Sequence, residues 1–208
     1  FTDNANNGAA DVYKDKKLPI YASNLCTEIM LPSNHDWSFV CVLSSINVLH
    51  YDKWKDTDAV ETMIYFLDAV ITEFLEKLEV YKNSDNRDDQ QTFLFMERAY
   101  NFSKENRALG MGVLGWHSLL QSKMLPFDSQ GAYDLNSEVF KNIKEHSNKA
   151  SKHLAEKFGE PELLKGYGRR NTTLNAVAPT TSSAFILGQV SQGLSLIHIS
   201  EPTRHLLI

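Results

Sequence analysis

The run Asn24-Leu25-Cys26-Thr27-Glu28-Ile29 places an amide, a thiol and a carboxylate at every second position. Successive side chains of a strand point to opposite faces, so we expect residues 23–30 to form a strand with these three groups on one face. Neighbouring groups would then lie about 6 to 7 Å apart, close enough to address adjacent atoms of one small substrate. The same spacing also suits a buried structural cysteine between an edge amide and a solvent-facing carboxylate.

The chain's other cysteine, Cys41, lies in a second apolar segment, residues 38–43. This segment is apolar on both faces, which is typical of a strand covered on both sides, and we expect a turn at Ser44-Ser45. The chain has only two cysteines and no apolar leader precedes them. We therefore expect a reducing, cytoplasmic setting in which both thiols are available.

Helical periodicity is clearest after residue 58, where apolar residues recur every three or four positions to residue 78. Asp58 is placed to cap this helix while Glu61 reaches back to it. The charged stretch 79–91 is predicted to be an exposed loop.

Three further helices are predicted over residues 95–109, 113–122 and 129–158. The first should end at Gly110-Met111-Gly112, because glycine readily takes the left-handed conformation of a helix cap. These glycines join helix to helix, which favours tight packing over a dinucleotide fingerprint. The last helix should stop at Gly159.

Near the carboxyl end, residues 174–178 are predicted to be a short strand that leads through Pro179 into a helix beginning at Thr180. The start of a helix can bind an anion through backbone N–H groups and the helix dipole, although a Ser/Thr turn is more often a plain cap. Residues 194–208 resemble a translated sequencing-adapter read-through. We treat them as a non-native tail without a functional role.

Composition narrows the class of protein. The 208 residues are 42% hydrophobic and 23% charged, which suits a globular domain and excludes collagen-like, disordered and disulfide-scaffold proteins. The most apolar stretch, residues 63–75, is interrupted by Asp68 and Glu73 and is too short to span a membrane. The net charge of -5 argues against nucleic-acid binding, and the histidines lack the spacing of a zinc site, so we expect no metal in this chain.

Four motifs in order carry a resemblance to a known family: Asn24-Leu25-Cys26-Thr27-Glu28-Ile29, Phe39-Val40-Cys41-Val42-Leu43-Ser44-Ser45-Ile46-Asn47, Arg107-Ala108-Leu109-Gly110-Met111-Gly112-Val113-Leu114-Gly115-Trp116-His117 and Ala178-Pro179-Thr180-Thr181-Ser182-Ser183. Together they resemble the large, catalytic subunit of class I ribonucleotide reductase over nearly all of residues 1–193. The chain, which begins at Phe1 rather than Met, is identified as an internal fragment of that family. The resemblance implies an α/β fold: part of a ten-stranded barrel with helices packed outside.

The resemblance also implies an activity, the reduction of ribonucleoside diphosphates to 2'-deoxyribonucleoside diphosphates. Cys26 matches the cysteine whose thiyl radical removes the 3'-hydrogen of the ribose, Glu28 the base on the 3'-hydroxyl, and Asn24 the amide that binds the sugar hydroxyls. Cys41 matches one of two cysteines that become a disulfide during turnover, and its partner lies upstream. The residues implied to bind substrate are Ser23, Thr180, Thr181, Ser182 and Ser183.

In this family the radical comes from a separate, metal-containing small subunit, and a thioredoxin- or glutaredoxin-like dithiol restores the cysteines. The resemblance therefore implies these two partners, a homodimer in the intact protein, and neither a membrane nor a nucleic acid as partner. The chain by itself is expected to be inactive, because its barrel is open and it lacks the family's C-terminal tyrosine pair and redox cysteines.

Two other hypotheses stay open. The chain could be a non-catalytic helical module that binds phosphate at Thr180–Ser183, or an inactive homologue. The position of the cysteines separates the first from a reductase. If Cys26, Cys41 and the Thr180 turn converge on one cavity, the reductase is favoured; if Cys26 is sealed in apolar packing far from that turn, the module is favoured.

Overall fold

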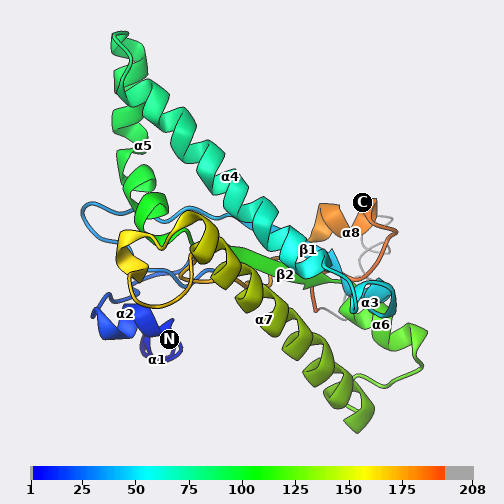
Figure 1. The fold of residues 1–208 in the computed structure, drawn as a ribbon. Helices are drawn as coiled ribbons and strands as arrows, with labels where there is room; N and C mark the ends of the chain where they lie inside the picture. The colour runs from blue at the N-terminus through cyan, green and yellow to red at the C-terminus, as the bar shows by residue number, and fades with distance from the viewer. Residues whose placement is uncertain (1, 195–208) are drawn as a thin grey trace.

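The computed structural model describes residues 2–194 and shows a small parallel sheet beneath long helices (Figure 1). The α/β character predicted from the sequence is confirmed, with two strands in the described part of the chain. In chain order the elements are α1 (Thr2–Asn7), α2 (Asp11–Asp15), β1 (Leu43–Asn47), η1 (Val48–His50), α3 (Tyr51–Trp54), α4 (Ala59–Lys82), α5 (Arg87–Asn106), β2 (Gly110–Leu114), α6 (Trp116–Ser122), α7 (Gln130–Phe158), η2 (Glu162–Leu164) and α8 (Thr181–Ile186).

The sheet pairs β1 with β2 in parallel, with Leu43 opposite Gly110 and Asn47 opposite Leu114. All five residues of β2 are buried, as expected for a parallel strand covered on both faces. Met111 and Val113 belong to the main core, which α4, α6 and α7 complete. Figure 1 shows α4 and α7 crossing over this sheet, so the core lies between the strands and these two helices.

The first strand begins later than predicted. Residues 38–42 are irregular, and β1 starts at Leu43, so the expected turn at Ser44-Ser45 is wrong. Both serines lie within the strand because their backbone groups pair with β2. The predicted strand over residues 174–178 is reduced to a single bridge between Asn175 and Met111.

The helix predicted after residue 58 is confirmed as α4, and Ile64, Leu67 and Ile71 carry its buried stripe. The prediction of a loop over residues 79–91 is wrong, because α4 continues to Lys82 and α5 begins at Arg87. Asn86 caps α5, and its side chain accepts a hydrogen bond of 2.9 Å from the backbone N–H of Asp88. Charged residues therefore form the exposed end of a helical hairpin.

The predicted capping of α4 by Asp58 and Glu61 is also wrong. The side chain of Asp58 makes no capping hydrogen bond. The Glu61 carboxylate instead accepts hydrogen bonds from α7, from His146 at 2.8 Å and Lys149 at 3.2 Å. The Glu61 carboxylate, which the local sequence predicts to cap α4, therefore makes tertiary contacts between α4 and α7 instead.

Helix α5 ends at Asn106, four residues before the first of the glycines at which we expected its cap. Arg107 takes the left-handed conformation there, with φ of 43°, and Gly110-Met111-Gly112 starts β2. The expectation of tight packing at these glycines has a clear basis at Gly112, where an added Cβ would lie 2.2 Å from the carbonyl oxygen of Ala176. The role assigned to Gly110 as a helix cap is wrong.

The long helix predicted over residues 129–158 is confirmed as α7. The Ser129 hydroxyl caps it by accepting a hydrogen bond of 3.2 Å from the backbone N–H of Ala132. The helix ends at Gly159, which has φ of 81°. The positive φ favours glycine at this position.

A buried polar network centres on Asp68 of α4. Its carboxylate pairs with Arg107 at 2.8 Å and with Arg170 at 3.1 Å. Asn171 donates to the same carboxylate at 2.9 Å and to the carbonyl of Arg107 at 2.9 Å. The network therefore ties α4 to the end of α5 and to the segment that follows α7.

In the described residues, no helix has the length and apolar composition needed to cross a membrane. The proposed non-native tail, residues 194–208, lies outside the described residues except for Leu194.

Candidate functional site

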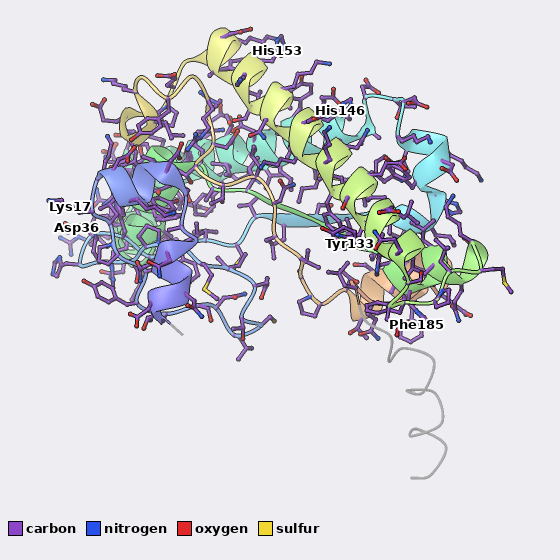
Figure 2. All side chains as sticks on the ribbon, turned by 90° about the horizontal axis from the view of Figure 1, so that it is seen from below. Lys17, Asp36, Tyr133, His146, His153 and Phe185 are labelled. Atoms are coloured by element: carbon purple, nitrogen blue, oxygen red, sulfur yellow. The ribbon has the colours of Figure 1, made fainter. Side chains whose placement is uncertain are left out.

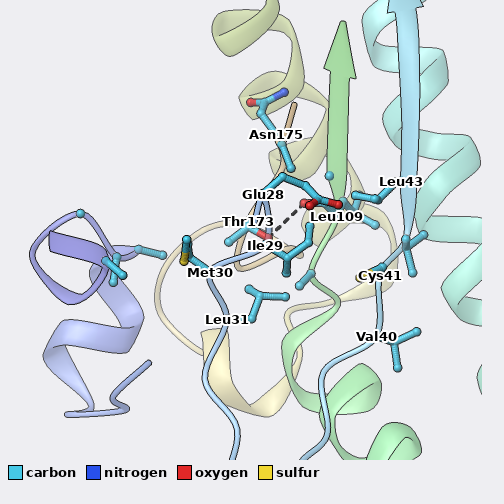
Figure 3. Close-up of a pocket in the computed structure, with 18 of the residues that line it drawn as sticks. Glu28, Ile29, Met30, Leu31, Val40, Cys41, Leu43, Leu109, Thr173 and Asn175 are labelled. Carbon is cyan, nitrogen blue, oxygen red and sulfur yellow. Dashed lines mark hydrogen bonds between the residues drawn. The ribbon is translucent and has the colours of Figure 1, made fainter. Parts of the chain in front are cut away.

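A cavity of about 350 Å³ lies where the two strands begin. Its wall comes from five separate parts of the chain, including the segment of Glu28 and the segment of Cys41 (Figure 3). In Figure 3 the Glu28 side chain points toward Leu43 and Leu109, at the start of β1 and just before β2. The cavity therefore brings together a carboxylate and a thiol that lie thirteen positions apart in the sequence.

The carboxylate of Glu28 has one oxygen, Oε2, that is buried and has no hydrogen-bond partner among the described residues. Leaving such an acceptor unsatisfied costs roughly 1–3 kcal/mol or more for a charged group. A ligand hydroxyl that reached this oxygen would remove that cost. Glu28 is thus ready to accept a hydrogen bond or a proton from a bound molecule.

The thiol of Cys41 lies on the same wall and is exposed. The atoms packed around its sulfur raise its pKa, and the negative charges of Glu28 and Cys26 raise the pKa further. Cys41 is therefore held in its protonated form more firmly than an ordinary thiol.

The segment around Cys26 is a loop, so the strand predicted over residues 23–30 is wrong. The backbone N–H of Thr27 donates to the Asn24 carbonyl at 3.1 Å, and Thr27 takes a left-handed conformation with φ of 66°. The side-chain oxygen of Asn24 accepts a hydrogen bond of 3.0 Å from the backbone N–H of Ile29. An asparagine side chain that binds its own backbone in this way competes with strand formation.

The loop changes how the predicted groups are arranged. Asn24, Cys26 and Glu28 do not share one face of a strand, because the backbone turns between them. Cys26 is exposed rather than sealed in apolar packing, and it lies two residues before the cavity wall. Ser23 donates to the carbonyl of Asn24 at 3.2 Å and so belongs to the same loop.

The predicted helix start at Thr180 is confirmed, since α8 begins at Thr181. The Thr180 hydroxyl is buried and accepts a hydrogen bond of 2.9 Å from the backbone N–H of Gly193. The Thr181 hydroxyl donates to the side-chain oxygen of Gln192 at 2.9 Å. Ser182 and Ser183 are exposed, and this leaves their hydroxyls accessible from solvent.

The structure does not bring the Thr180 turn to the cavity of Glu28 and Cys41. The side chain of Asn47, at the end of β1, donates to the carbonyl of Leu187 just after α8, whereas Cys41 precedes the start of β1. A strand of five residues spans roughly 13–16 Å. Figure 2 likewise places Phe185 of α8 and Lys17, just after α2, on opposite sides of the molecule.

Thr173 and Asn175 also line the cavity, and no motif in the sequence pointed to them. Asn175 donates to the carbonyl of Met111 at 3.3 Å, which holds this segment against β2. The signal was available as a polar run, Asn171 to Asn175, ahead of an apolar stretch. Within residues 2–194, no group of three or more potential ligands is placed to hold a metal ion.

Comparisons with known proteins agree with the mixed α/β fold. Residues 1–163 match the family described as "Ribonucleotide reductase, barrel domain". The solved structure of the Actinobacillus ureae class Id ribonucleotide reductase alpha subunit is 55% identical, with a TM-score of 0.85 over 94% of this chain and 35% of that one. The chain belongs to the ribonucleotide reductase barrel-domain family and is a homologue of class I alpha subunits.

Curated relatives show the same relationship. A protein of Frog virus 3 (isolate Goorha), provisionally assigned as a ribonucleoside-diphosphate reductase large subunit, is 39% identical over 90% of this chain and 31% of its own length. The vitamin B12-dependent ribonucleoside-diphosphate reductase of Mycobacterium tuberculosis (strain CDC 1551 / Oshkosh) is 29% identical over 81% of this chain and 23% of its own length. The chain thus spans about a third or less of the proteins it matches.

Proposed function

We propose that this chain is part of the large subunit of a class I ribonucleoside-diphosphate reductase, with its catalytic groups on the loop 23–30 and on Cys41. The observation that carries the proposal is the pairing of Glu28 and Cys41 on one cavity, with a buried Glu28 oxygen that lacks a partner among residues 2–194. A ribose presents hydroxyl groups that such an oxygen binds.

In the proposed reaction Cys26, as a thiyl radical, removes the 3'-hydrogen of the ribose. Glu28 accepts the proton of the 3'-hydroxyl, and Asn24 offers amide N–H groups because its oxygen is already bound to Ile29. The 2'-hydroxyl then takes a proton from one of the two reducing thiols and leaves as water, and the hydrogen atom held by Cys26 returns to the 3'-carbon at the end of turnover. Cys41 and a second cysteine, which by the resemblance lies upstream, supply two electrons and become a disulfide.

The diphosphate is proposed to bind at the start of α8. Ser182 and Ser183 have exposed hydroxyls and, with the first backbone N–H groups of the helix, supply donors to an anion. Thr180 and Thr181 support the turn through Gly193 and Gln192. Because the turn and the cavity lie at opposite ends of β1, the substrate would have to extend along the strands.

The remaining parts of the proposal concern the intact protein. They comprise a closed ten-stranded barrel, a homodimer, a small subunit whose metal cofactor supplies the radical, a thioredoxin- or glutaredoxin-like reductant and a cytoplasmic location. A homologue that depends on vitamin B12 matches this chain as well. The radical source is therefore a property to be tested rather than one that the barrel fixes.

A chimeric enzyme tests the proposal. The matching segment of the class Id alpha subunit, which is 55% identical, is replaced by residues 1–193, and deoxynucleotide formation is measured with that enzyme's radical-generating partner. We expect turnover in the chimera and none in its Cys26→Ser variant, with nucleotide affinity nearly unchanged. A folded chimera that binds nucleotide but shows no turnover, or turnover that survives Cys26→Ser, would contradict the proposal.

A further inference from the structure

The two cysteines of the chain lie on different segments that meet at one place. Cys26 is in the loop before Glu28, and Cys41 is in the irregular segment that enters β1. Both are free thiols and both are exposed. Neither side chain is held in a packed core, so each sulfur is open to a small oxidant from solvent.

Their separation is limited by the cavity wall. Glu28 to Leu31 and Val40 to Leu43 line the same cavity, so these two segments face each other across it. Cys26 precedes Glu28 by two residues, a distance of at most about 7 Å along the chain. As a thiolate, Cys26 would also raise the pKa of Cys41, which agrees with the nearness of the two segments at the cavity wall.

The loop that carries Cys26 has room to adjust. Leu25, Cys26 and Thr27 are all exposed, and two hydrogen bonds anchor the loop at Asn24, to Thr27 and to Ile29. A disulfide requires Cα atoms within roughly 7 Å, and an exposed turn can reach that separation without disturbing the core. Cys41 lies two residues before the start of β1, so it stays in place while the loop of Cys26 moves toward it.

We propose that Cys26 and Cys41 form an intramolecular disulfide when the chain meets a small disulfide oxidant such as oxidised glutathione. A thiolate of the pair attacks the oxidant, forming a mixed disulfide and releasing one glutathione. The second cysteine then attacks the mixed disulfide and releases the second glutathione. Two thiols and one glutathione disulfide thus become one protein disulfide and two glutathione thiols.

The disulfide would fasten the loop across the mouth of the cavity beside Glu28. Resting on the proposed function, it would also remove the thiol assigned to hydrogen abstraction and one of the thiols assigned to reduction. Oxidation would therefore switch off the site reversibly, since a dithiol reductant restores both sulfurs.

The test uses the purified chain equilibrated with glutathione buffers and then quenched with acid. The expected product is a monomer lighter by two hydrogen atoms. Glu28 is the one glutamate between the two cysteines. Cleavage after glutamate should therefore yield two peptides joined by the disulfide, which reduction separates.

The folded state is compared with the chain in urea, because an unfolded segment also closes disulfides. We expect the effective concentration of the two thiols to be at least about tenfold higher in the folded chain than in urea. The matched variants Cys26→Ser and Cys41→Ser should each take up a single glutathione. Mixed disulfides on both cysteines, dimers joined by disulfides, or an effective concentration no higher than in urea would each overturn the inference. The mass readout is independent of catalysis and of the chimera experiment.

Discussion

Asp68 and Arg107 form an ion pair of 2.8 Å with both side chains about 95% buried. Arg107 immediately precedes Ala108, which lines the cavity, and Asn171 joins both members of the pair shortly before Thr173, another lining residue. Two parts of the cavity wall therefore depend on one carboxylate of α4. Loss of the Asp68 carboxylate should lower the stability of the chain and change the shape of the cavity.

We expect Asp68→Ala to destabilise the chain by about 3–5 kcal/mol, because it leaves Arg107 buried without its counter-charge. The measurement is the urea midpoint of unfolding, followed by circular dichroism. The matched control is Asp52→Ala, which removes an exposed carboxylate from Lys123 and should cost less than about 1 kcal/mol. Equal losses in the two variants would show that the buried network contributes no more to the free energy of unfolding than an exposed ion pair does.

Asp68 should also impose a pH dependence. Burial raises its pKa, but hydrogen bonds and charge from Arg107, Asn171 and Arg170 outweigh burial, so the pKa lies below the ordinary value. Its stabilisation is therefore complete above the ordinary carboxyl pKa of about 4 and is lost as the pH falls through the lower folded-state pKa.

Asp68→Asn should accordingly show a flatter dependence of unfolding free energy on pH below about pH 4 than the unaltered chain. Urea titrations at a series of acidic pH values measure this slope. Parallel slopes for the two proteins would mean that other carboxylates cause the acid sensitivity.

Gly112→Ala should cost about 2–3 kcal/mol, since the new methyl group would meet backbone atoms of Ala176 and Val177. Gly110→Ala is the matched control in the same strand. Its closest obstacle is the end of the Leu43 side chain, which can rotate away, so we expect the smaller loss. The urea midpoints of unfolding of the two variants measure these losses. A larger loss of stability for Gly110→Ala than for Gly112→Ala would contradict the prediction.

Helix caps offer a further comparison. Ser129→Ala should cost about 1 kcal/mol because its hydroxyl accepts a hydrogen bond at the start of α7. Asp58→Ala should change stability little, since Asp58 makes no such bond at α4. A chemical denaturation series on both variants checks this, and a cost at Asp58 as large as at Ser129 would refute the assignment.

The long helices could be predicted because their periodicity extends over many turns. Ile64, Leu67 and Ile71 repeat along α4, and Ser129 and Gly159 mark the ends of α7. The strands were harder, because β2 is five residues long and begins with a Gly-Met-Gly run that is also typical of a helix end. Gly112 is in a strand packed closely against Ala176. Ala176 lies far along the chain, so the residues around Gly112 do not reveal this contact.

The identity of the candidate site residues came from motifs, while their arrangement did not. Period two placed Asn24, Cys26 and Glu28 on one strand face, but the segment is a loop in which the Asn24 side-chain oxygen accepts a hydrogen bond from the backbone N–H of Ile29. The meeting of Glu28 with Cys41 depends on how two distant segments lie against β2. No pattern within either segment contains that information.

The pairing of Leu43 with Gly110 affects the order in which parts of the fold form during synthesis. All of α3, α4 and α5 lies between the two strands, so β1 leaves the ribosome well before its partner exists. The helical hairpin can close from neighbouring residues in the meantime, whereas the strand pair must wait for a long loop to be brought together. Sheet formation should therefore be a late event in folding, after the hairpin of α4 and α5 has closed.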